Sequence, residues 1–396
     1  MNDTQAKYPQ LRFKGFADPW EQCKLGDVAK ITMGQSPNSK NYTDNPKDHI
    51  LVQGNADMKD GQVHPRIWTT EITKIADKGD LILSVRAPVG DIGKTSYDVV
   101  IGRGVAAIKG NEFIFQLLKR MKTVGYWTKY STGSTFESIN SLEINNAVIN
   151  LPKEHEQNKV GKILSYMDHA ITLHEEKKRQ LERLKSALLK KMFADKSGYP
   201  VVRFKEFCDE WQGTKLRKIS KIVRGASPRP ISDPKWFDND SNVGWLRISD
   251  VTSQDGRIHH LKQHISKQGQ AKTRVISEPH LLLSIAATVG KPLINYVKIG
   301  VHDGFLIFIE PQFDLEFMFQ WLEMFRPQWS KYGQPGSQIN LNSDLVKNQI
   351  IYLPSREEQN QIGIFLNQID SLINLHQQKI NNINSVKKSL LQKMFI

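Results

Sequence analysis

Two long stretches of the sequence carry apolar residues at alternating spacings of four and three, which is typical of a helix with one apolar stripe. After the second turn, neither stretch contains a proline or glycine. The pattern predicts two helices of about 40 residues, each about 60 Å long at 1.5 Å per residue. The positions of this seam are Val160, Leu164, Met167, Ile171, His174, Lys178, Leu181, Lys185, Leu188 and Met192 in the first stretch, and Ile362, Leu366, Ile369, Ile373, His376, Ile380, Ile383, Lys387, Leu390 and Met394 in the second.

The sequence also marks where the two helices begin and end. Acidic residues fill both first turns and lysines crowd both last turns, as the helix dipole favours. Ser355 with Glu358 fits a capping box. An apolar stripe this long needs a partner, and the nearest partner is the other helix. Because one lobe precedes each helix, we expect the helices to pair antiparallel with a lobe at each end.

Two histidines fall near the middle of the seams. We interpret His174 and His376 as polar seam residues that fix the register of the helix pair. A metal-binding or catalytic pair is the alternative interpretation. Symmetric antiparallel pairing predicts that the two histidines lie near each other at the axis.

The chain repeats itself at about half its length. YPQLRFKGFADPWEQCKL from Tyr8 resembles YPVVRFKEFCDEWQGTKL from Tyr199, and LILSVRAPVG from Leu81 resembles LLLSIAATVG from Leu281. The two helices end in ALLKKMF and SLLQKMF. These matches indicate a tandem duplication with a small insertion in the second copy, and they predict two similar lobes related by a pseudo-two-fold.

The middles of the two copies, residues 38–80 and 229–280, barely align, although both ends agree well. The framework was kept while the surface that it carries diverged, as expected for two copies of one binding module that read different targets. We therefore predict an α+β fold. It consists of two similar mixed α/β lobes separated by two long helices packed as an antiparallel coiled coil.

Composition narrows the class of partner. The formal net charge of +14 and the pI near 9.5 favour a polyanionic partner, most often nucleic acid. Two cysteines, Cys23 and Cys208, exclude a disulfide framework and a cysteine-rich zinc site. The N-terminus has no apolar signal core, and no segment approaches the roughly 20 apolar residues of a membrane helix. We expect a soluble, cytoplasmic protein.

No catalytic motif stands out in the sequence. IGKT at 92–95 looks like the end of a phosphate-binding loop, but the first glycine of that motif would fall at Pro88. H-E-x-x-H, G-x-S-x-G and clustered Cys/His ligands are missing. Asp250 and Asp255 are flanked by turn residues and indicate a loop. Nothing in the sequence demands an enzyme, a metal site or a cofactor site in this chain.

Turn-rich segments in both lobes carry donors and acceptors suited to phosphates and base edges. A plain loop surface is the alternative for any one of these residues, but their recurrence in both lobes of a basic protein favours nucleic-acid contact. Arg247 has a second interpretation, as a residue that supports a strand. The candidate DNA-binding residues are Gln35, Ser36, Asn38, Lys40, Arg66, Arg86, Arg103, Ser134, Thr135, Ser227, Arg229, Arg247, Arg257, Lys291, Ser337 and Gln338.

The alternation of variable and well-matched regions resembles the specificity subunit of a type I restriction–modification enzyme. The segments LPKEHEQNKVGKILSYMDHAI and LPSREEQNQIGIFLNQIDSLI carry the resemblance, which covers nearly the whole chain. It implies target recognition domains at residues 1–151 and 197–353. It also implies conserved spacer helices at residues 152–196 and 354–396.

The resemblance further implies a non-catalytic chain that joins double-stranded DNA, two modification (methyltransferase) subunits and restriction (ATP-dependent nuclease) subunits. S-adenosylmethionine, ATP and Mg would be bound by those partners and not by this chain. Each lobe would read one half of a bipartite, asymmetric site, mainly in the major groove, and the helix pair would set the gap. The alternatives are a stand-alone two-lobed DNA-binding regulatory or architectural protein, and an enzyme that acts alone on DNA.

Overall fold

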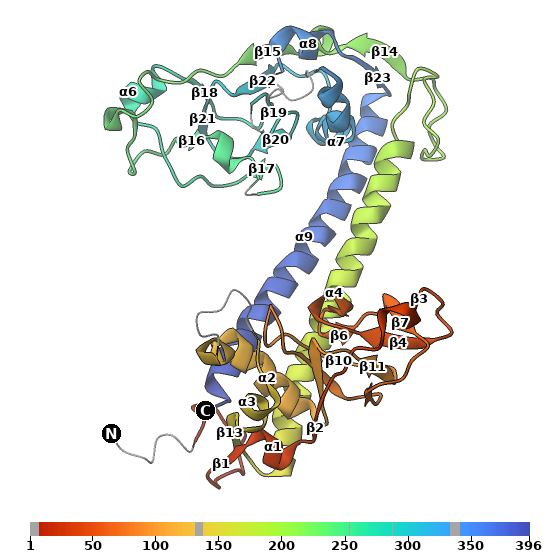
Figure 1. Ribbon diagram of the computed structural model, residues 1–396. Helices are drawn as coiled ribbons and strands as arrows, with labels where there is room; N and C mark the ends of the chain where they lie inside the picture. Colours follow the sequence, from red (N-terminus) through yellow and green to blue (C-terminus); the bar gives the residue numbers. More distant parts are fainter. Residues whose placement is uncertain (1–7, 131–137, 253, 287, 333–340) are drawn as a thin grey trace. The chain divides into compact units, whose positions relative to one another are not determined.

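Two compact units make up the fold of the chain, as seen in a computed structural model (Figure 1). Unit 1 consists of Met1–Glu175 and Gln378–Ile396, and unit 2 of Glu176–Gln377. Each unit therefore contains one lobe together with part of both long helices. The structure describes residues 8–130, 138–252, 254–286, 288–332 and 341–396.

The lobe of unit 1 is built on a six-stranded sheet of order β2-β12-β9-β10-β6-β5 and a five-stranded sheet of order β3-β7-β4-β11-β8. β1 pairs antiparallel with β13, which directly precedes the first long helix. The strands are β1 (Glu21–Lys24), β2 (Ile31–Met33), β3 (Tyr42–Thr43), β4 (His49–Val52), β5 (Met58–Lys59), β6 (Gln62–Val63), β7 (Ile67–Thr69), β8 (Ile75–Ala76), β9 (Leu81–Ser84), β10 (Ile92–Lys94), β11 (Val99–Ile101), β12 (Val105–Ile108) and β13 (Val148–Leu151). The helices are α1 (Leu25–Val28), α2 (Glu112–Thr123), α3 (Ser141–Asn145) and the 3₁₀ turns η2 (Ser39–Asn41), η3 (Asn55–Asp57) and η4 (Tyr126–Tyr130).

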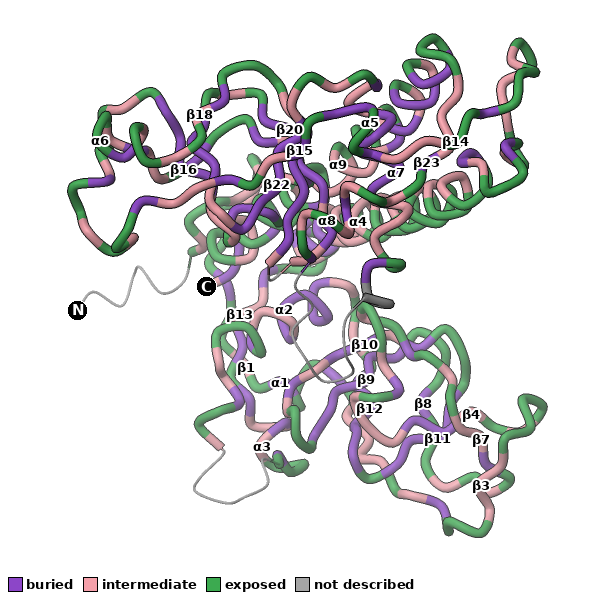
Figure 2. The backbone as a smooth tube through the Cα atoms, turned by 90° about the horizontal axis from the view of Figure 1, so that it is seen from above, coloured by how far each residue is buried: buried purple, intermediate pink, exposed green. Residues whose placement is uncertain are grey.

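The core of unit 1 lies between the six-stranded sheet and α2. β9 and β12 are buried along their whole length, so they are continuous apolar strands rather than alternating ones (Figure 2). Asn111 caps helix α2 from the position before its first residue, and its side chain accepts a hydrogen bond from the Ile114 amide at 3.1 Å. Its buried face, with Phe113 and Leu117, packs against the sheet.

The lobe of unit 2 has a five-stranded sheet of order β15-β22-β19-β20-β17, a three-stranded sheet of order β16-β21-β18, and the pair β14-β23. The strands are β14 (Gln212–Lys215), β15 (Lys221–Arg224), β16 (Gly244–Leu246), β17 (Arg257–Ile258), β18 (Arg274–Ile276), β19 (Leu281–Ser284), β20 (Pro292–Asn295), β21 (Ile299–Val301), β22 (Phe305–Ile309) and β23 (Ile350–Leu353). The helices are α5 (Leu216–Ile219), α6 (Lys267–Gln270), α7 (Leu315–Phe325), α8 (Ser343–Asn348) and the 3₁₀ turns η5 (Pro234–Trp236), η6 (Ile248–Asp250) and η7 (Arg326–Tyr332).

The two lobes share one arrangement of strands and helices. The strands β15, β22, β19 and β20 repeat the order of β2, β12, β9 and β10, and α7 follows β22 as α2 follows β12. Asp314 caps α7 through the Phe317 amide at 2.9 Å, as Asn111 caps α2. The predicted pair of similar mixed α/β lobes is therefore confirmed.

The two predicted long helices are also confirmed: α4 (Glu154–Lys191) and α9 (Arg356–Lys393) have 38 residues each. In unit 1 the start of α4 packs antiparallel to the end of α9, and in unit 2 the end of α4 packs antiparallel to the start of α9 (Figure 1). Every position of the predicted seam is buried or partly buried. His174 belongs to unit 1 and His376 to unit 2, so their proximity stays a prediction.

The bounds of the long helices fall inside the ranges 152–196 and 354–396 given above for the spacers. The compact units divide the chain differently, because each unit takes part of both helices and one lobe. Lobes and helices are therefore not separately packed bodies. Each lobe builds one core together with the helix segments beside it.

The repeated Lys-Met-Phe ends of the two helices close these cores. In unit 1 the ring of Phe395 stacks on that of Phe113 at 4.9 Å and meets Trp20 edge-on at 6.2 Å. In unit 2 the ring of Phe193 lies 5.2 Å from that of Phe317. Each lobe therefore receives the aromatic end of the helix that follows the other lobe in the sequence.

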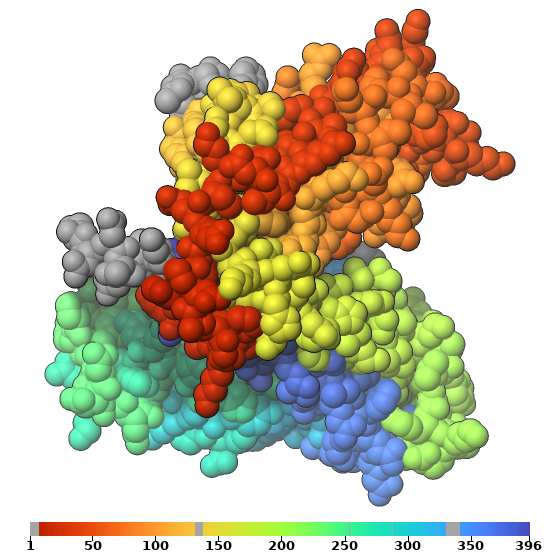
Figure 3. All heavy atoms as spheres, turned by 90° about the horizontal axis from the view of Figure 1, so that it is seen from below, coloured from red at the N-terminus to blue at the C-terminus, as the bar shows by residue number. Residues whose placement is uncertain are grey.

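A segment before each lobe is fastened to the first turn of a long helix by an arginine. Arg12 binds both carboxylate oxygens of Glu156 at 2.7 Å, and Arg203 binds Glu358 at 2.7 and 2.8 Å. Only 1% of each glutamate side chain is exposed. Figure 3 shows the red N-terminal segment lying against the yellow start of α4. The Ser355 hydroxyl accepts from the Glu358 amide at 3.3 Å, as the capping box predicted, while the Glu358 carboxylate binds Arg203.

We expect Arg12→Met to lower the free energy of unfolding of unit 1 by about 2 to 3 kcal/mol, because Glu156 would keep a buried charge without its cation. Urea unfolding followed by tryptophan fluorescence measures this change. Lys153→Met is the control, since it removes an ion pair with Asp18 that lies at the surface, and it should have little effect. Equal losses in both variants would contradict the role given to Arg12.

Candidate nucleic-acid interface

Four segments of the lobe in unit 1 meet around a small cleft of about 360 Å³. They are the loop after β2, the end of β4, the β9–β10 connection and the β11–β12 turn. Three of the predicted DNA-binding residues are brought together here although they are far apart in sequence. The lining residues are Ser36, Gln53, Gly54, Asn55, Ser84, Arg86, Ala87, Arg103 and Gly104.

The backbone holds these segments close together. β4 and β11 are parallel, so the residues that follow them leave the sheet at the same edge. A side chain at Gly34 would place its Cβ 2.1 Å from the carbonyl oxygen of Gly102, and one at Gly104 would place it 2.0 Å from that of Gln53. The Arg103 amide donates to the Ser36 hydroxyl at 3.1 Å. These close backbone contacts form the floor of the cleft and leave no room for side chains at Gly34 and Gly104, whereas the longer side chains at the cleft are not restricted in this way.

The side chains at the cleft are suited to hydrogen-bond recognition. Arg86 and Arg103 are exposed, and within the described residues neither has an ion-pair partner. The Nε2 atom of Gln53 is buried without a hydrogen-bond partner in the same part of the chain. Arginine suits guanine or phosphate as a two-point donor, and glutamine suits adenine. Nearby, Arg66 lies 3.5 Å from Asp57 and its side chain is half exposed.

Unit 2 carries a different charge at the corresponding place. Ser227 stands in the loop after β15 as Ser36 stands in the loop after β2. Asp303 follows β21 as Arg103 follows β11, so an acid replaces a base. The two lobes therefore carry side chains of opposite charge at this one position of a shared scaffold.

Asp303 collects four neighbours in unit 2. The Ser227 hydroxyl donates to its Oδ1 at 3.0 Å, and a terminal nitrogen of Arg229 lies 2.6 Å from its Oδ2. Arg224 donates to the Asp303 backbone carbonyl at 2.6 Å. His302 Nδ1 lies 3.0 Å from Oδ1. The predicted Ser227 and Arg229 are thus neighbours, joined through a residue that the sequence alone did not single out.

These contacts decide the charges of the cluster. Burial lowers the pKa of His302, and Arg229 and Arg224 lower it further, while Asp303 opposes them. Burial acts to raise the pKa of Asp303, but the Ser227 hydrogen bond and the nearby cations outweigh it and lower the pKa overall. At neutral pH the cluster therefore holds a neutral histidine and an ionised aspartate.

Arg247 follows β16 and lines a cleft of about 470 Å³ in unit 2. Its guanidinium binds Asp250 at 3.1 and 3.2 Å, and its own amide donates to the same carboxylate at 3.0 Å. Arg247 thus supports the turn η6 directly after a strand. The lining residues are Ile231, Ser232, Phe237, Trp245, Arg247, Ile248, Ser249, Gln263 and His302.

Other predicted DNA-binding residues lie elsewhere. Gln35, Asn38 and Lys40 are exposed in the loop after β2, where Asn38 caps η2. Arg257 has 13% of its side chain exposed and binds Glu316 and Asp370, and it lines neither cleft. Lys291 lies 3.9 Å from Glu323, also away from both clefts. Four candidates fall outside the described residues: Ser134, Thr135, Ser337 and Gln338.

Sequence reasoning missed Gln53, Asp303 and His302. Gln53 stands in the middle of the first copy, where the copies barely align, and its buried amide nitrogen could not be foreseen. Asp303 and His302 could have been found, because the strand before them matches the strand before Arg103 and the charge changes between the copies.

Two kinds of binding site raised by the sequence, a metal site and a phosphate-binding loop, can be compared with the described residues. No group of three or more His, Cys, Asp or Glu side chains in that part of the chain is placed to hold a metal ion. Lys94 of the IGKT segment lies in strand β10 and binds Glu112, so the segment forms no phosphate-binding loop. None of the described helices is long and apolar enough to cross a membrane.

Two lobes with one scaffold and different cleft residues, joined by two long helices, define a class of protein. The family described as "Type I restriction modification DNA specificity domain" matches residues 17–183 and 208–385. These ranges cover most of the chain, and the chain belongs to this family.

Individual relatives agree with this assignment. A putative type I restriction enzyme MjaX specificity subunit of Methanocaldococcus jannaschii is 31% identical over 188 residues, 45% of this chain and 44% of that protein. The match thus spans less than half of that relative's length. The type I restriction enzyme MjaVIII specificity subunit of the same organism is 22% identical over 398 residues, 94% of this chain and 91% of that protein.

Solved structures show a similar fold. The S subunit of a type I restriction–modification system from M. genitalium gives a TM-score of 0.67 at 13% identity, covering 98% of this chain and 99% of that one. A chain from a study of complex assembly and conformational transition of the type I R-M system gives 0.54 at 18% identity, covering 95% and 97%.

We expect opposite shifts in the pKa of His302 from two substitutions in its cluster. Asp303→Asn removes the negative charge that favours the protonated ring, so the pKa of His302 should fall further. Arg229→Ala removes an opposing cation, so that pKa should rise. An NMR titration of the His302 ring protons measures both shifts, and a titration unchanged by either substitution would contradict the cluster.

Proposed function

We propose that this chain is the non-catalytic DNA-recognition subunit of a type I restriction–modification complex. It recognises a bipartite, asymmetric DNA site, with one half-site read by each lobe. The observation that carries the proposal is that the same connection, after β11 in unit 1 and after β21 in unit 2, places an exposed Arg103 at the cleft of one lobe and Asp303 with its bound Ser227 and Arg229 in the other. Two identical half-sites would not call for such different side chains.

The lobe of unit 1 is suited to read base edges in the major groove, where the base pairs can be told apart. Arg86 and Arg103, which have no ion-pair partner among the described residues, could make two-point contacts with guanine or with phosphates. The buried Nε2 of Gln53 is a donor that a base or an ordered water would satisfy. In unit 2 Asp303 holds Arg229 near the Ser227 hydroxyl, which offers a different pattern of donors and acceptors.

The two long helices are suited to set the gap between half-sites. Each helix of 38 residues is about 57 Å long at 1.5 Å per residue, compared with about 34 Å for one turn of DNA. Because each lobe shares its core with both helices, a lobe cannot turn freely on a linker. This attachment of each lobe to the helices supports the proposal that the number of base pairs between half-sites is fixed.

The partners proposed for this chain are double-stranded DNA, two modification subunits and restriction subunits. S-adenosylmethionine, ATP and Mg would then be bound by the modification and restriction subunits, and this chain would direct those subunits to the site. Membership in the specificity family supports this division of labour. The complex would work in the cytoplasm, where the DNA of the cell is accessible to it.

A stand-alone two-lobed DNA-binding regulatory or architectural protein is the second candidate. It would share the basic charge and the two lobes. It would bind its DNA site with full affinity without any modification subunit, and this difference separates the two candidates.

The reconstituted complex of this chain with its modification subunits should methylate one bipartite DNA sequence with a constant gap. Sequencing of methylated bases after treatment of genomic DNA with the complex measures the site directly. The two half-sites should differ in sequence, because the two lobes carry different side chains at corresponding positions such as Arg103 and Asp303. Methylation of a palindrome, or of no defined site, would contradict the proposal, as would methylation by this chain alone.

Arg103→Ala should weaken binding to the half-site read by unit 1 by about 1 to 3 kcal/mol if the guanidinium reads a guanine. If it contacts a phosphate instead, the slope of the logarithm of the binding constant against the logarithm of the salt concentration should decrease in magnitude by about one. Fluorescence anisotropy with the mapped site over a range of salt concentrations distinguishes the two cases. Arg229→Ala is the matched control, since its effect should be confined to the other half-site. Unchanged affinity and salt dependence for Arg103→Ala would exclude this residue from the interface.

A further inference from the structure

Two lysines interrupt the apolar seams of the long helices at corresponding positions. In unit 1 Lys387 of α9, with 8% of its side chain exposed, binds Asp168 of α4. In unit 2 Lys185 of α4, with 16% exposed, binds Asp370 of α9. A lysine buried on a seam is unfavourable unless its charge is paired. Each pair therefore constrains how α4 and α9 lie against each other.

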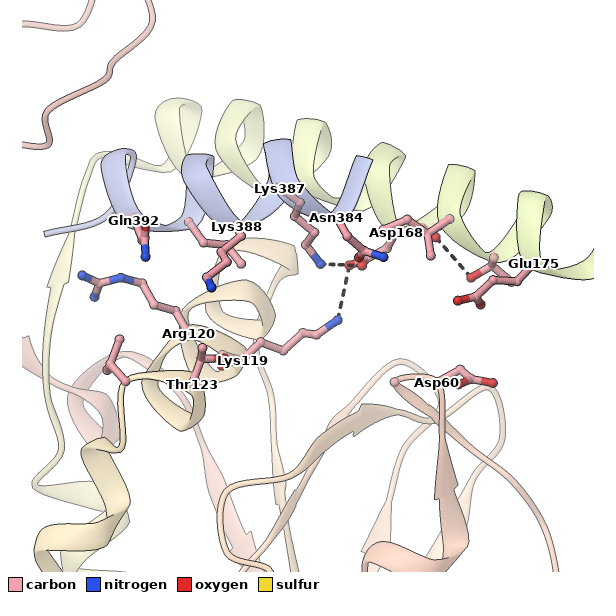
Figure 4. Close-up of a pocket in the computed structure, with 15 residues that line it drawn as sticks. Asp60, Lys119, Arg120, Thr123, Asp168, Glu175, Asn384, Lys387, Lys388 and Gln392 are labelled. Carbon is pink, nitrogen blue, oxygen red and sulfur yellow. Dashed lines mark hydrogen bonds and ion pairs between the residues drawn. The ribbon is translucent and has the colours of Figure 1, made fainter. Parts of the chain in front are cut away.

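The same aspartates are also held by the lobes. Gln116 of α2 donates to Asp168 at 2.8 Å, and Gln320 of α7 donates to Asp370 at 2.8 Å. Lys119 of α2 reaches Asp168 from the lobe at 3.5 Å (Figure 4). We call each aspartate, with the side chains that bind it from the other long helix and from the lobe, a carboxylate hub. Each hub joins both long helices and one lobe at a single carboxylate.

The lobe of unit 2 reaches its hub with a different cation. Arg257 of β17 lies 3.2 Å from Asp370 and 2.6 Å from Glu316, and its guanidinium lies 4.4 Å from the ring centre of Phe319. In unit 1 the corresponding cation is Lys119, which comes from α2 and not from a strand. The two lobes have diverged, yet both keep a cation on the helix aspartate. A contact between a lobe cation and the helix aspartate is therefore common to both units, although the cation comes from a different element in each.

The spacing of the hub residues fits one helix register. Asp168 precedes Lys185 by 17 residues on α4, and Asp370 precedes Lys387 by 17 residues on α9. In an antiparallel pair, equal spacings of this kind allow one register to satisfy both hubs at once.

Apolar contacts alone would select this register less sharply. Sliding α9 by one heptad would bring Ile380 or Met394 of the same seam next to Asp168. The apolar faces would still meet, because their attraction is not directional. The aspartate, however, would lose its lysine, and polar seam residues are known to specify register in this way. Charged hydrogen bonds also fix the angle of approach of the lobe.

We propose that Asp168 with Lys387, and Asp370 with Lys185, are positioning residues that fix the number of base pairs accepted between the two half-sites. They act through the register of the helix pair and the setting of each lobe on it, without touching DNA. This inference rests on the function proposed above and adds the residues that determine one part of its specificity.

The test uses the full chain in complex with its modification subunits, and DNA in which the mapped half-sites are separated by the natural gap or by one base pair more or less. The hub-free variant carries Asp168→Asn, Asp370→Asn, Lys185→Met and Lys387→Met. These substitutions keep the volume of the seam and leave no buried charge unpaired. The aromatic helix ends still close both cores, so the variant should fold.

We expect wild-type complex to methylate the natural gap strongly over both altered gaps. In the hub-free variant, methylation of the altered gaps relative to the natural gap should rise about tenfold, because the ion pairs that join α4 to α9 are removed and the lobe side chains keep only weaker hydrogen bonds to neutral amides. The half-site sequences should not change. A merely structural role would lower methylation at all gaps alike and leave this ratio unchanged, and that result would overturn the inference.

The matched control is Lys109→Met with Asp77→Asn, which removes a surface ion pair of unit 1 with the same types of substitution. Its gap preference should equal that of the wild type. A wild-type complex without any preferred gap would overturn the proposed function, whereas a preserved preference in the hub-free variant would overturn only the role of the hubs.

If the hub-free variant fails to fold, a second measurement, on the chain alone with a single hub substitution, tests the same inference. Spin labels at Lys47→Cys in the lobe and Ser385→Cys on α9, with Cys23 and Cys208 replaced by serine, report the setting of the lobe in unit 1. Electron–electron resonance should give a broader distance distribution for Lys387→Met than for the native lysine. An equally narrow distribution would overturn the inference.

Discussion

Neither lobe of this protein completes its core with its own half of the sequence. The lobe of unit 1 packs Trp20 and Phe113 around Phe395, and the lobe of unit 2 packs Phe317 against Phe193. Burial of these aromatic rings removes a large apolar area from water at each junction. Because each helix ends in the lobe of the other copy, the antiparallel packing of the helices within each unit and the attachment of each lobe to them depend on this exchange.

The scaffold and the recognition surface follow different physical rules. Gly34 and Gly104 are fixed because a side chain at either position would collide with a backbone carbonyl. Arg103 is exposed and the corresponding Asp303 is partly exposed, so neither side chain is fixed by packing in the core. Under the function proposed above, a change of target would require a change of side chains at the edge of the sheet, while the strands and their pairing could stay the same.

The long helices and the duplication were predictable, because a heptad pattern and a repeat are both written in the linear sequence. The cleft was predictable only in part. Ser36, Arg86 and Arg103 were named for their chemistry, but their meeting place depends on the parallel pairing of β4 with β11. Arg257 was named as a DNA contact, yet it lies with Asp370. Lys185 and Lys387 were seen as interruptions of a seam, because a sequence pattern does not reveal which carboxylate meets a buried lysine.

The exchange of helix ends also orders the assembly of the protein in time. Unit 2 is one continuous segment, Glu176–Gln377, and every residue of its core has been synthesised before the end of α9 is made. Unit 1 is interrupted by that segment and waits for Met394 and Phe395. On the ribosome, the lobe that is made first is therefore the last to close, and its apolar surface stays open to chaperones while the second lobe folds.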